Sequence, residues 1–565
     1  MTDLAREVAG DFTAVRPDGP ARSIIRRIAR VILPRDPYDT AAVLLLVVLT
    51  GLVVATFRDY AITNDEWIQH RYGELIVAYY QSGFSDRSVF ALDNLYLYGG
   101  LFDVVAILLG HVVAMDIFDL RHLICGLIGV AGLGAAMATA RMICGSRAGL
   151  IAGVALAVCG SWYGTMFHHS KDIPLAAAMA GALYFLMRAG RALPTPKSGH
   201  VIGFGLLTGA ALGIKVLGLL LVGYVGVVIL LNIPAPLMSE PRQVKRFVRG
   251  SLVRLIPALA IAYAIMIVAW PWSALSPLNP IRGLFSFADF HYNIRTVLDG
   301  TVYRMATIPR LYVPIYILIK LPLLMLAGAA LAMAFAAWAT VVNGAMARRT
   351  RGEVAIVAFA ALFPVVCEVV AHGPAFCGLR HFLFVLPPLA ILAGVGLDLT
   401  AVRLAGAQRW LGLAALAVMV AGFSWNALTL YRLHPYQYLV FNPLVGGLEG
   451  ASRRYVMDYW FTIMPEAVDG LEDYLARTEP VESRNPGHSY SVAICGERAA
   501  FLKKAKPHLH WAEVWETADF FIAPTHMNCD RDSNGKIVVT VQRLGVPLGY
   551  VKDQRSARRM AGPAG

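Results

Sequence analysis

Two adjacent carboxylates, Asp65 and Glu66, follow the first long apolar segment of the sequence. At a membrane surface, one such carboxylate could act as a general base toward an acceptor hydroxyl, and the pair could instead bind a divalent cation. A structural interpretation also fits, because Asn64 or Asp65 could cap a helix that starts at Trp67. The acidic pair is therefore a candidate site whose chemistry the dipeptide alone does not decide.

A second polar cluster lies directly before Pro174. Asp172 could cap the helix that Pro174 enters in its first turn, which accounts for these two residues structurally. Helix capping does not account for the histidines and the lysine that accompany them. We therefore include four residues of this cluster among the site candidates: His168, His169, Lys171 and Asp172.

Four cations form the third group of candidates: Lys215, Lys320, Arg380 and His381. The order of the apolar segments places all four near the outer face of a membrane, where basic residues are less common than on the cytoplasmic face. A planar guanidinium donates two hydrogen bonds to a phosphate at once. The structural alternative for each cation is a side chain that extends to the lipid headgroups. Together with the carboxylates, these cations predict a site for an anionic, membrane-held substrate.

The composition is that of a chain that lies mostly in lipid. Of its 565 residues, 57% are hydrophobic and 15% are charged, whereas a soluble protein carries about 25% charged residues. The formal net charge is +13, and the basic residues lie between apolar segments. That distribution is typical of cytoplasmic loops and argues against nucleic acid as a partner.

Apolar runs of membrane-spanning length divide the first three quarters of the chain. A helix needs about 20 apolar residues to cross a bilayer. Lys215 separates two short runs, because a lysine is costly in the middle of a membrane and tolerated at its interface. We predict about eleven transmembrane helices, near residues 41–57, 120–143, 148–166, 173–189, 201–214, 216–231, 252–272, 312–341, 354–371, 383–400 and 410–428.

Loop charge fixes the predicted orientation of these helices. With the N-terminus inside, each cytoplasmic loop is basic, as the positive-inside rule requires. We expect a cytoplasmic basic tail over residues 1–40, a transmembrane domain over 41–430 with an outer loop at 58–119, and an extracytoplasmic domain over 431–565. Within the outer loop, apolar residues between 101 and 113 recur at helical spacing, which suits a helix lying along the membrane surface.

The C-terminal tail has the polar composition of a soluble domain. Short apolar runs at 491–494, 520–523 and 536–541 predict strands, with helical stretches between them, so we expect a small α/β domain. Cys495 and Cys529 are the only cysteines in this tail. They are candidates for a disulfide if the tail faces an oxidising compartment.

Several strings of the sequence, taken in order, resemble the GT-C membrane glycosyltransferases. The resemblance is specifically to the protein-mannosyltransferase-like group, glycosyltransferase family 39, and it covers most of residues 40–465. Where many bacterial relatives have Asn-Pro before Lys-Asp, this chain has His169-Ser170. The strings are Asn64-Asp65-Glu66, His169 to Pro174, Gly213-Ile214-Lys215, Leu379 to Phe382, Leu386-Pro387-Pro388, His434 to Gln437, Phe441-Asn442-Pro443, Gly446-Gly447 and Asp458-Tyr459-Trp460.

The resemblance implies an inverting transfer of a sugar from a polyprenyl-phosphate donor to an acceptor on the outer leaflet. By the same resemblance, Asp65 is the base that deprotonates the acceptor hydroxyl, and Asp172 is the second acidic residue. Glu66 is a third catalytic candidate, which could orient Asp65. A carboxylate suits proton removal, and cations suit the charge that develops on the leaving phosphate. The residues implied to bind the donor phosphate are Lys171, Lys215, Arg380 and His381.

The sequence leaves the acceptor, the sugar and the use of a metal ion open. The acceptor could be a protein, a glycan or a lipid, and the sugar is undetermined. Some GT-C enzymes need a divalent ion such as Mg or Mn and others do not. If this chain uses one, Asp65 and Asp172 are its candidate ligands by the resemblance. The short loops and the Ala-, Gly- and Arg-rich composition favour a bacterial inner membrane, with the C-terminal domain in the periplasm.

Three alternatives compete with a transferase. A transporter or flippase of lipid-linked glycans predicts internal repeats and interrupted helices, and the sequence shows no repeat. A polymerase or ligase of surface glycans predicts a large outer loop late in the chain rather than an acidic pair after the first span. A non-catalytic scaffold that displays the tail domain does not explain Asp65, Asp172 and Arg380.

Overall fold

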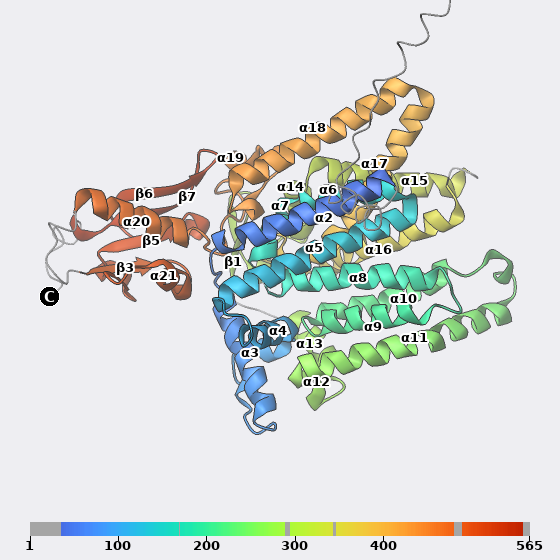
Figure 1. The fold of residues 1–565 in the computed structure, drawn as a ribbon, viewed down its shortest axis with the longest axis horizontal. Coiled ribbons are helices and arrows are strands. Elements are labelled where there is room, and N and C mark those ends of the chain that lie inside the picture. Colours follow the sequence, from blue (N-terminus) through green and yellow to red (C-terminus); the bar gives the residue numbers. More distant parts are fainter. Residues whose placement is uncertain are drawn as a thin grey trace, which may run out of the picture.

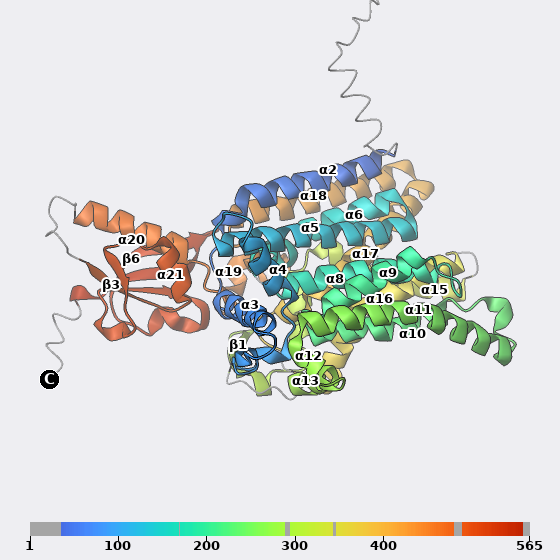
Figure 2. The same ribbon diagram turned by 60° about the horizontal axis from the view of Figure 1, so that its bottom comes forward.

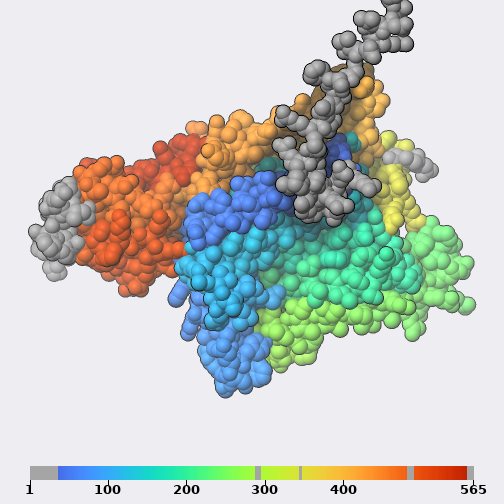
Figure 3. All heavy atoms as spheres, in the orientation of Figure 1, coloured from blue at the N-terminus to red at the C-terminus, as the bar shows by residue number. Residues whose placement is uncertain are grey.

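The computed structural model describes residues 36–168, 170–288, 294–342, 346–373, 375–479 and 489–556. Within these residues, a bundle of long helices carries a small sheet domain at one end (Figure 1). A space-filling view shows this sheet domain projecting from the helical body (Figure 3). The prediction of a polytopic helical membrane protein with a small C-terminal α/β domain is confirmed.

Eight helices in the described part of the chain are long and apolar enough to cross a membrane. The first begins where the Asp36 carboxylate accepts hydrogen bonds from the first turn and Pro37 supplies a preset backbone angle. These apolar helices make the chain an integral membrane protein. The eight are α2 (Pro37–Thr56), α5 (Ile117–Cys144), α8 (Asp172–Gly190), α11 (Pro241–Ala269), α15 (Leu323–Val341), α16 (Arg348–Ala371), α17 (Leu386–Ala407) and α18 (Arg409–Leu433).

The remaining predicted spans are helical but shorter or bent. α6 (Ser146–Ala157) and the helical segment Gly160–Phe167 that follows it are bent by 67° at the short break between them. α9 (Ser198–Leu212) and α10 (Leu220–Leu231) have 15 and 12 residues. The backbone is extended at Lys215, so the prediction of two helices rather than one is correct. All eleven predicted segments are helical, but the one span predicted at 312–341 is two helices, α14 (Tyr312–Lys320) and α15, because the backbone is extended at Leu321 before Pro322. Whether α9 and α10 cross the membrane completely stays a prediction.

The first outer loop forms two helices, α3 (Glu66–Gln81) and α4 (Leu101–Gly110), at the same end of the bundle as the sheet domain. In both views, α3 and α4 lie at the ends of the long helices on the side of the bundle that carries that domain (Figures 1 and 2). Gly73 permits a close approach of the two helices, because a methyl group at this position would lie 2.7 Å from Cβ of Asp103. A helix is present in the predicted region 101–113 as α4, and its position along the membrane surface stays a prediction.

A five-stranded mixed sheet forms the core of the C-terminal domain. The strand order is β4-β3-β5-β7-β6, in which β3 runs parallel to β4 and β5, and β7 runs antiparallel to β5 and β6. The sequence predicted three of these strands and missed β4 and β7. The elements are α20 (Met464–Thr478), β3 (Tyr490–Ile494), α21 (Arg498–Lys504), β4 (Leu509–Trp511), β5 (Phe520–Pro524), β6 (Lys536–Arg543) and β7 (Val546–Asp553).

A disulfide stabilises this domain, and ion pairs attach it to the helical bundle. A disulfide joins Cys495, which follows β3, to Cys529 in the turn after β5. Lys503 of α21 pairs with Asp116, at 2.8 Å, and with Asp119 at the start of α5. The domain is thus docked on the end of the bundle where the first outer loop lies.

Replacing both disulfide cysteines, as Cys495→Ser with Cys529→Ser, is expected to destabilise the sheet domain by about 3–4 kcal/mol. The bond closes a loop across a sequence separation of 34, which limits the unfolded chain. The loss of stability is measured as faster amide hydrogen exchange in β3 and β5 of the full-length protein. Cys367→Ser, at an exposed free cysteine, is the control; equal protection in both proteins would contradict the expectation.

Candidate active site

Arg380 joins two carboxylates that lie far apart in the sequence. Its Nη2 pairs with Asp65, which directly precedes α3, and its Nε donates to Asp172 Oδ2 at 3.0 Å. Asp172 is the first residue of α8, and Arg380 opens the 3₁₀ helix Arg380–Val385 before α17. Each of the three residues lies at the start of a helix. Their side chains meet at the end of the bundle where α3 and α4 lie.

Lys215 completes this cluster from the break between α9 and α10. Its Nζ pairs with Asp172 Oδ1, so two cations share the Asp172 carboxylate. The side chains of Asp172, Lys215 and Arg380 are 2%, 7% and 8% exposed, whereas that of Asp65 is 37% exposed. Asp65 is therefore the carboxylate of the cluster that an acceptor in solution can reach.

The cap interpretation of Asp65 does not hold in the structure. Asp65 occupies the position before α3, but its side chain makes no capping hydrogen bond and is directed to Arg380 instead. A carboxylate that neither caps its helix nor lies fully buried is suited to exchange a proton with a ligand.

Lys171 adds a third cation next to the cluster. Its Nζ lies 4.1 Å from the centre of the Tyr98 ring, a cation–π contact, and its side chain is buried. Burial lowers the pKa of Lys171 to about 8, and the Asp65 carboxylate opposes this shift. Lys171, Lys215 and Arg380 thus form a cationic group. Its three positive charges exceed the two negative charges of Asp65 and Asp172 by one.

Glu66, predicted as a catalytic residue, has a different place. Its Oε2 accepts a hydrogen bond from the Thr63 amide at 2.8 Å, and its Oε1 lies 3.1 Å from Nε2 of His122. The Thr63 hydroxyl in turn donates to the His168 carbonyl at 3.0 Å. The Glu66 amide also donates to the Thr63 carbonyl at 3.0 Å, so the two residues close the turn before α3. Glu66 is only 2% exposed, and its contacts fix the turn that carries Asp65.

Arg121 was missed by the sequence analysis. Its Nη2 donates to Asp103 Oδ1 at 2.7 Å and to the Ser170 hydroxyl at 3.0 Å, and the Arg121 and Asp103 side chains are each 1% exposed. Burial raises the pKa of Asp103, and Arg121 opposes that shift. The contacts link α4, α5 and the loop that carries Lys171. A possible signal was the Arg-His pair at the start of a predicted span, since an arginine there requires a partner.

His168 is packed among aromatic rings. Its ring centre lies 5.3 Å from that of Tyr60, 5.0 Å from that of Tyr438 and 5.1 Å from that of Trp460, and the residue is 1% exposed. These contacts support a packing role for His168 rather than a role in proton transfer. His169, the neighbouring candidate, lies outside the described residues.

Lys320 and His381 lie next to the Arg380 cluster. Lys320 is buried, donates to the Tyr438 carbonyl at 2.7 Å and lies 3.9 Å from the centre of the Phe441 ring. It lines a small cavity together with Arg380. The His381 ring packs 4.5 Å from that of Phe376. The structure brings together Asp65, Lys171, Asp172, Lys215 and Arg380.

The segment after α18 closes the site from the C-terminal side. Tyr60 donates to Gln437 Oε1 at 3.2 Å, and the Gln437 amide lies 2.9 Å from His434 Nδ1. His434 Nε2 lies 3.0 Å from Asp59, so a chain of polar contacts ties this segment to the first outer loop. The Trp460 ring from the same segment faces the Arg380 guanidinium at 5.8 Å. The segment therefore contributes to the walls of the site.

An apolar groove starts beside the cationic group and runs along the bundle. Its volume is about 460 Å³, and its walls come from α4, α5, α8 and α9. Near the site it is lined by Phe102, Pro174 and Ile214, which neighbour Asp103, Asp172 and Lys215 in the sequence. Farther along it is lined by Tyr184 and Phe185 in the second half of α8. A long apolar chain attached to an anionic group matches this arrangement.

The Arg380 cluster does not fit a divalent ion between Asp65 and Asp172. The guanidinium lies between the two carboxylates and supplies the positive charge that a metal would bring. Among the residues that the structure describes, no group of three or more His, Cys, Asp or Glu side chains could hold a metal. We therefore derive no step through a metal ion.

No family model and no curated protein matches the sequence. Among solved structures, the chain is similar to ArnT from Cupriavidus metallidurans bound to undecaprenyl phosphate, with a TM-score of 0.45, 16% identity, and coverage of 90% of this chain and 97% of that chain. It is similar to the oligosaccharyltransferase AglB from Archaeoglobus fulgidus in complex with an inhibitory peptide and a dolichol-phosphate (TM-score 0.43, 12% identity, 85% and 69% coverage). It is also similar to the arabinofuranosyltransferase AftD from Mycobacteria (TM-score 0.40, 14% identity, 90% and 39% coverage). At these TM-scores we base no assignment of activity on the likenesses.

The two carboxylates of the cluster are expected to differ in their effect on stability. Asp172→Asn leaves Lys215 and Arg380 without their shared buried partner, which is expected to destabilise the protein by about 3–5 kcal/mol. Asp65→Asn removes a partly exposed charge and is expected to change stability by less than about 1 kcal/mol. Unfolding of the purified variants in detergent measures both. The reverse order of effects would contradict the geometry described for this cluster.

Proposed function

We propose that the chain is an inverting membrane glycosyltransferase that moves a sugar from a polyprenyl-phosphate donor to an acceptor hydroxyl at the outer face. The observation that supports this most directly is the arrangement of the site. A solvent-accessible carboxylate, Asp65, lies across one guanidinium from a buried cationic group at the head of an apolar groove. The three parts match an acceptor hydroxyl, a phosphate and a lipid chain.

Asp65 is the proposed general base. The acceptor oxygen attacks the anomeric carbon of the sugar, forming the new glycosidic bond, while its proton passes to the Asp65 carboxylate. The bond between the anomeric carbon and the phosphate oxygen breaks, and its electron pair leaves on the phosphate. Attack opposite the leaving group inverts the configuration. The ion pair with Arg380 fixes the direction in which Asp65 points.

Lys171, Lys215 and Arg380 are the proposed phosphate ligands. The charge that develops on the leaving phosphate is stabilised by cations that are already in place, and little reorganisation is then needed during the reaction. Asp172 holds Lys215 and Arg380 in this arrangement. Its proposed role is to position these cations rather than to accept a proton, since its two oxygens already face them.

The groove between α4, α5, α8 and α9 is the proposed binding site of the polyprenyl chain. Its apolar walls begin beside the proposed phosphate ligands, so one donor molecule could occupy both. The charged cluster lies at one end of the bundle, beside the first outer loop. This position favours a transferase over a transporter, for which polar residues near the middle of the membrane are expected.

The proposed topology places the N-terminus in the cytoplasm of a bacterial inner membrane and the sheet domain in the periplasm. The common position of the first outer loop and the sheet domain at one end of the bundle supports this orientation (Figure 1). Within the proposed function, the sugar is a hexose or pentose, and the acceptor is a glycan, a lipid or a protein. Comparing lipid-linked sugars and surface glycans between wild-type and deletion strains would identify both.

Asp65→Asn is expected to lower the rate of sugar transfer by about 10²–10⁴-fold, the contribution of a general base. The assay follows transfer from a polyprenyl-phosphate sugar in membranes with matched protein levels. Asp93→Asn is the control, because it removes an exposed carboxylate from the same outer loop. Normal transfer by Asp65→Asn would refute its assignment as the base.

The Lys171 assignment predicts a pH dependence of donor binding. A lysine with a pKa of about 8 is charged below that pH and loses its charge above it. The KM for the donor is therefore expected to rise as the pH increases through about 8. Lys171→Arg keeps its charge throughout this range, so its KM is expected to stay flat. The same rise in both proteins would show that another group titrates.

A further inference from the structure

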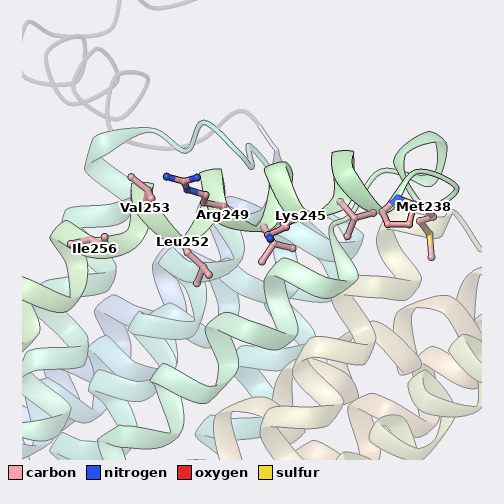
Figure 4. Close-up of a pocket in the computed structure, with 9 residues that line it drawn as sticks. Met238, Lys245, Arg249, Leu252, Val253 and Ile256 are labelled. Atoms are coloured by element: carbon pink, nitrogen blue, oxygen red, sulfur yellow. The ribbon is translucent and has the colours of Figure 1, made fainter.

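A second groove lies at the start of α11, at the end of the bundle opposite the sheet domain (Figure 1). Its volume is about 620 Å³, and it is lined by two cations, Lys245 and Arg249, and by apolar side chains. Figure 4 shows the cations on successive turns of the helix, followed by Leu252, Val253 and Ile256. We call this feature the α11 groove. It is remote from Asp65 and has no part in the proposed transfer.

The spacing of its residues combines charge and apolar surface on one face of the helix. Lys245 and Arg249 are four residues apart, so both point to the same side. Val248 and Leu252 continue that side by one turn toward the middle of the membrane-spanning helix. Leu252, Val253 and Ile256 are 48%, 53% and 56% exposed, and they present an apolar surface that no other described element covers.

The other wall of the α11 groove is held in place by a polar contact. Met238, 64% exposed, closes the groove from the loop before α11. Arg348 donates to the Ile233 carbonyl at 3.1 Å and contacts the Met238 sulfur at 3.5 Å, which fixes that loop. Met238 also borders a neighbouring apolar groove whose lining includes Arg351. Cations and apolar grooves thus recur side by side along this edge of the bundle.

The charge balance of the α11 groove favours an anion. No acidic residue lines it, and within the described part of the chain neither Lys245 nor Arg249 forms an ion pair. The nearest acidic residue in the sequence, Glu240, accepts a hydrogen bond from Gln243. Arg242 and Arg246 lie on the same helix turns but outside the groove. Lys245 and Arg249 are therefore the two cations of this basic segment that line the apolar groove.

We propose that the α11 groove binds an anionic phospholipid of the adjoining leaflet. Lys245 and Arg249 contact the phosphate, and an acyl chain lies along Val248, Leu252 and Ile256. A cationic pair above an apolar, lipid-facing furrow complements both parts of such a lipid. A soluble anion would use only the cations, and a zwitterionic lipid would leave their charge uncompensated.

Native mass spectrometry of the full-length protein with phosphatidylglycerol or phosphatidylcholine tests this site. Wild-type protein is expected to retain phosphatidylglycerol in preference, and Lys245→Gln with Arg249→Gln is expected to weaken that retention at least about tenfold. The matched control, Arg242→Gln with Arg246→Gln, removes the same charge from the same helix and is expected to retain the lipid.

Three results would overturn the proposal. Unchanged retention in the groove variant would exclude Lys245 and Arg249 as the binding residues. Equal losses in both double variants would indicate diffuse attraction by the whole basic segment rather than a site. Displacement of the lipid by an excess of inorganic phosphate would indicate an anion site that does not use the apolar furrow. All four substituted positions are exposed, so correct folding is expected and is verified by thermal unfolding.

Discussion

The ion pairs that Arg380 makes with Asp65 and Asp172 connect parts of the chain that are otherwise independent. Asp65 comes from the first outer loop, Asp172 from the start of α8, and Arg380 from the segment that leads into α17. Lys215 adds the break between α9 and α10. Asp172, Lys215 and Arg380 are buried, so each of these three charges needs its partner, because an uncompensated charge is far more costly there than in water. The positions of four chain segments therefore depend on one another, and the site exists only when all are assembled.

A second set of buried polar contacts holds the loops that carry this cluster in place. Glu66 ties the turn before α3 to His122, and Arg121 ties α4 to the loop before α8. These contacts start from adjacent residues of α5, so one helix end supports both acidic loops. Gly73 allows α3 and α4 to pack closely above it. The buried partners of both acidic loops thus lie in the second turn of a membrane-spanning helix rather than in the loops themselves.

Much of this arrangement could be predicted from the sequence, for identifiable physical reasons. Apolar length predicts the helices, and Lys215 predicts a break because a lysine is costly inside a membrane. Residue type and predicted side of the membrane were enough to select Asp65, Asp172 and Arg380. The partners of Glu66 and Arg121 could not be predicted, because a single sequence gives no distance between residues 49 or 56 positions apart. For the same reason the aromatic packing around His168 could not be predicted. The catalytic assignment of Glu66 stays a prediction.

The shared use of Arg380 has a consequence for the order of events in the proposed reaction. Arg380 neutralises Asp65 in the structure, and a neutralised carboxylate is a weak base. A donor phosphate bound by Lys171, Lys215 and Arg380 competes with Asp65 for the same guanidinium and brings negative charge close to it. In the proposed reaction, donor binding therefore frees the Asp65 carboxylate from its arginine, so Asp65 can take the acceptor proton only once the donor is in place. An acceptor that arrives first meets a carboxylate that is still held by Arg380.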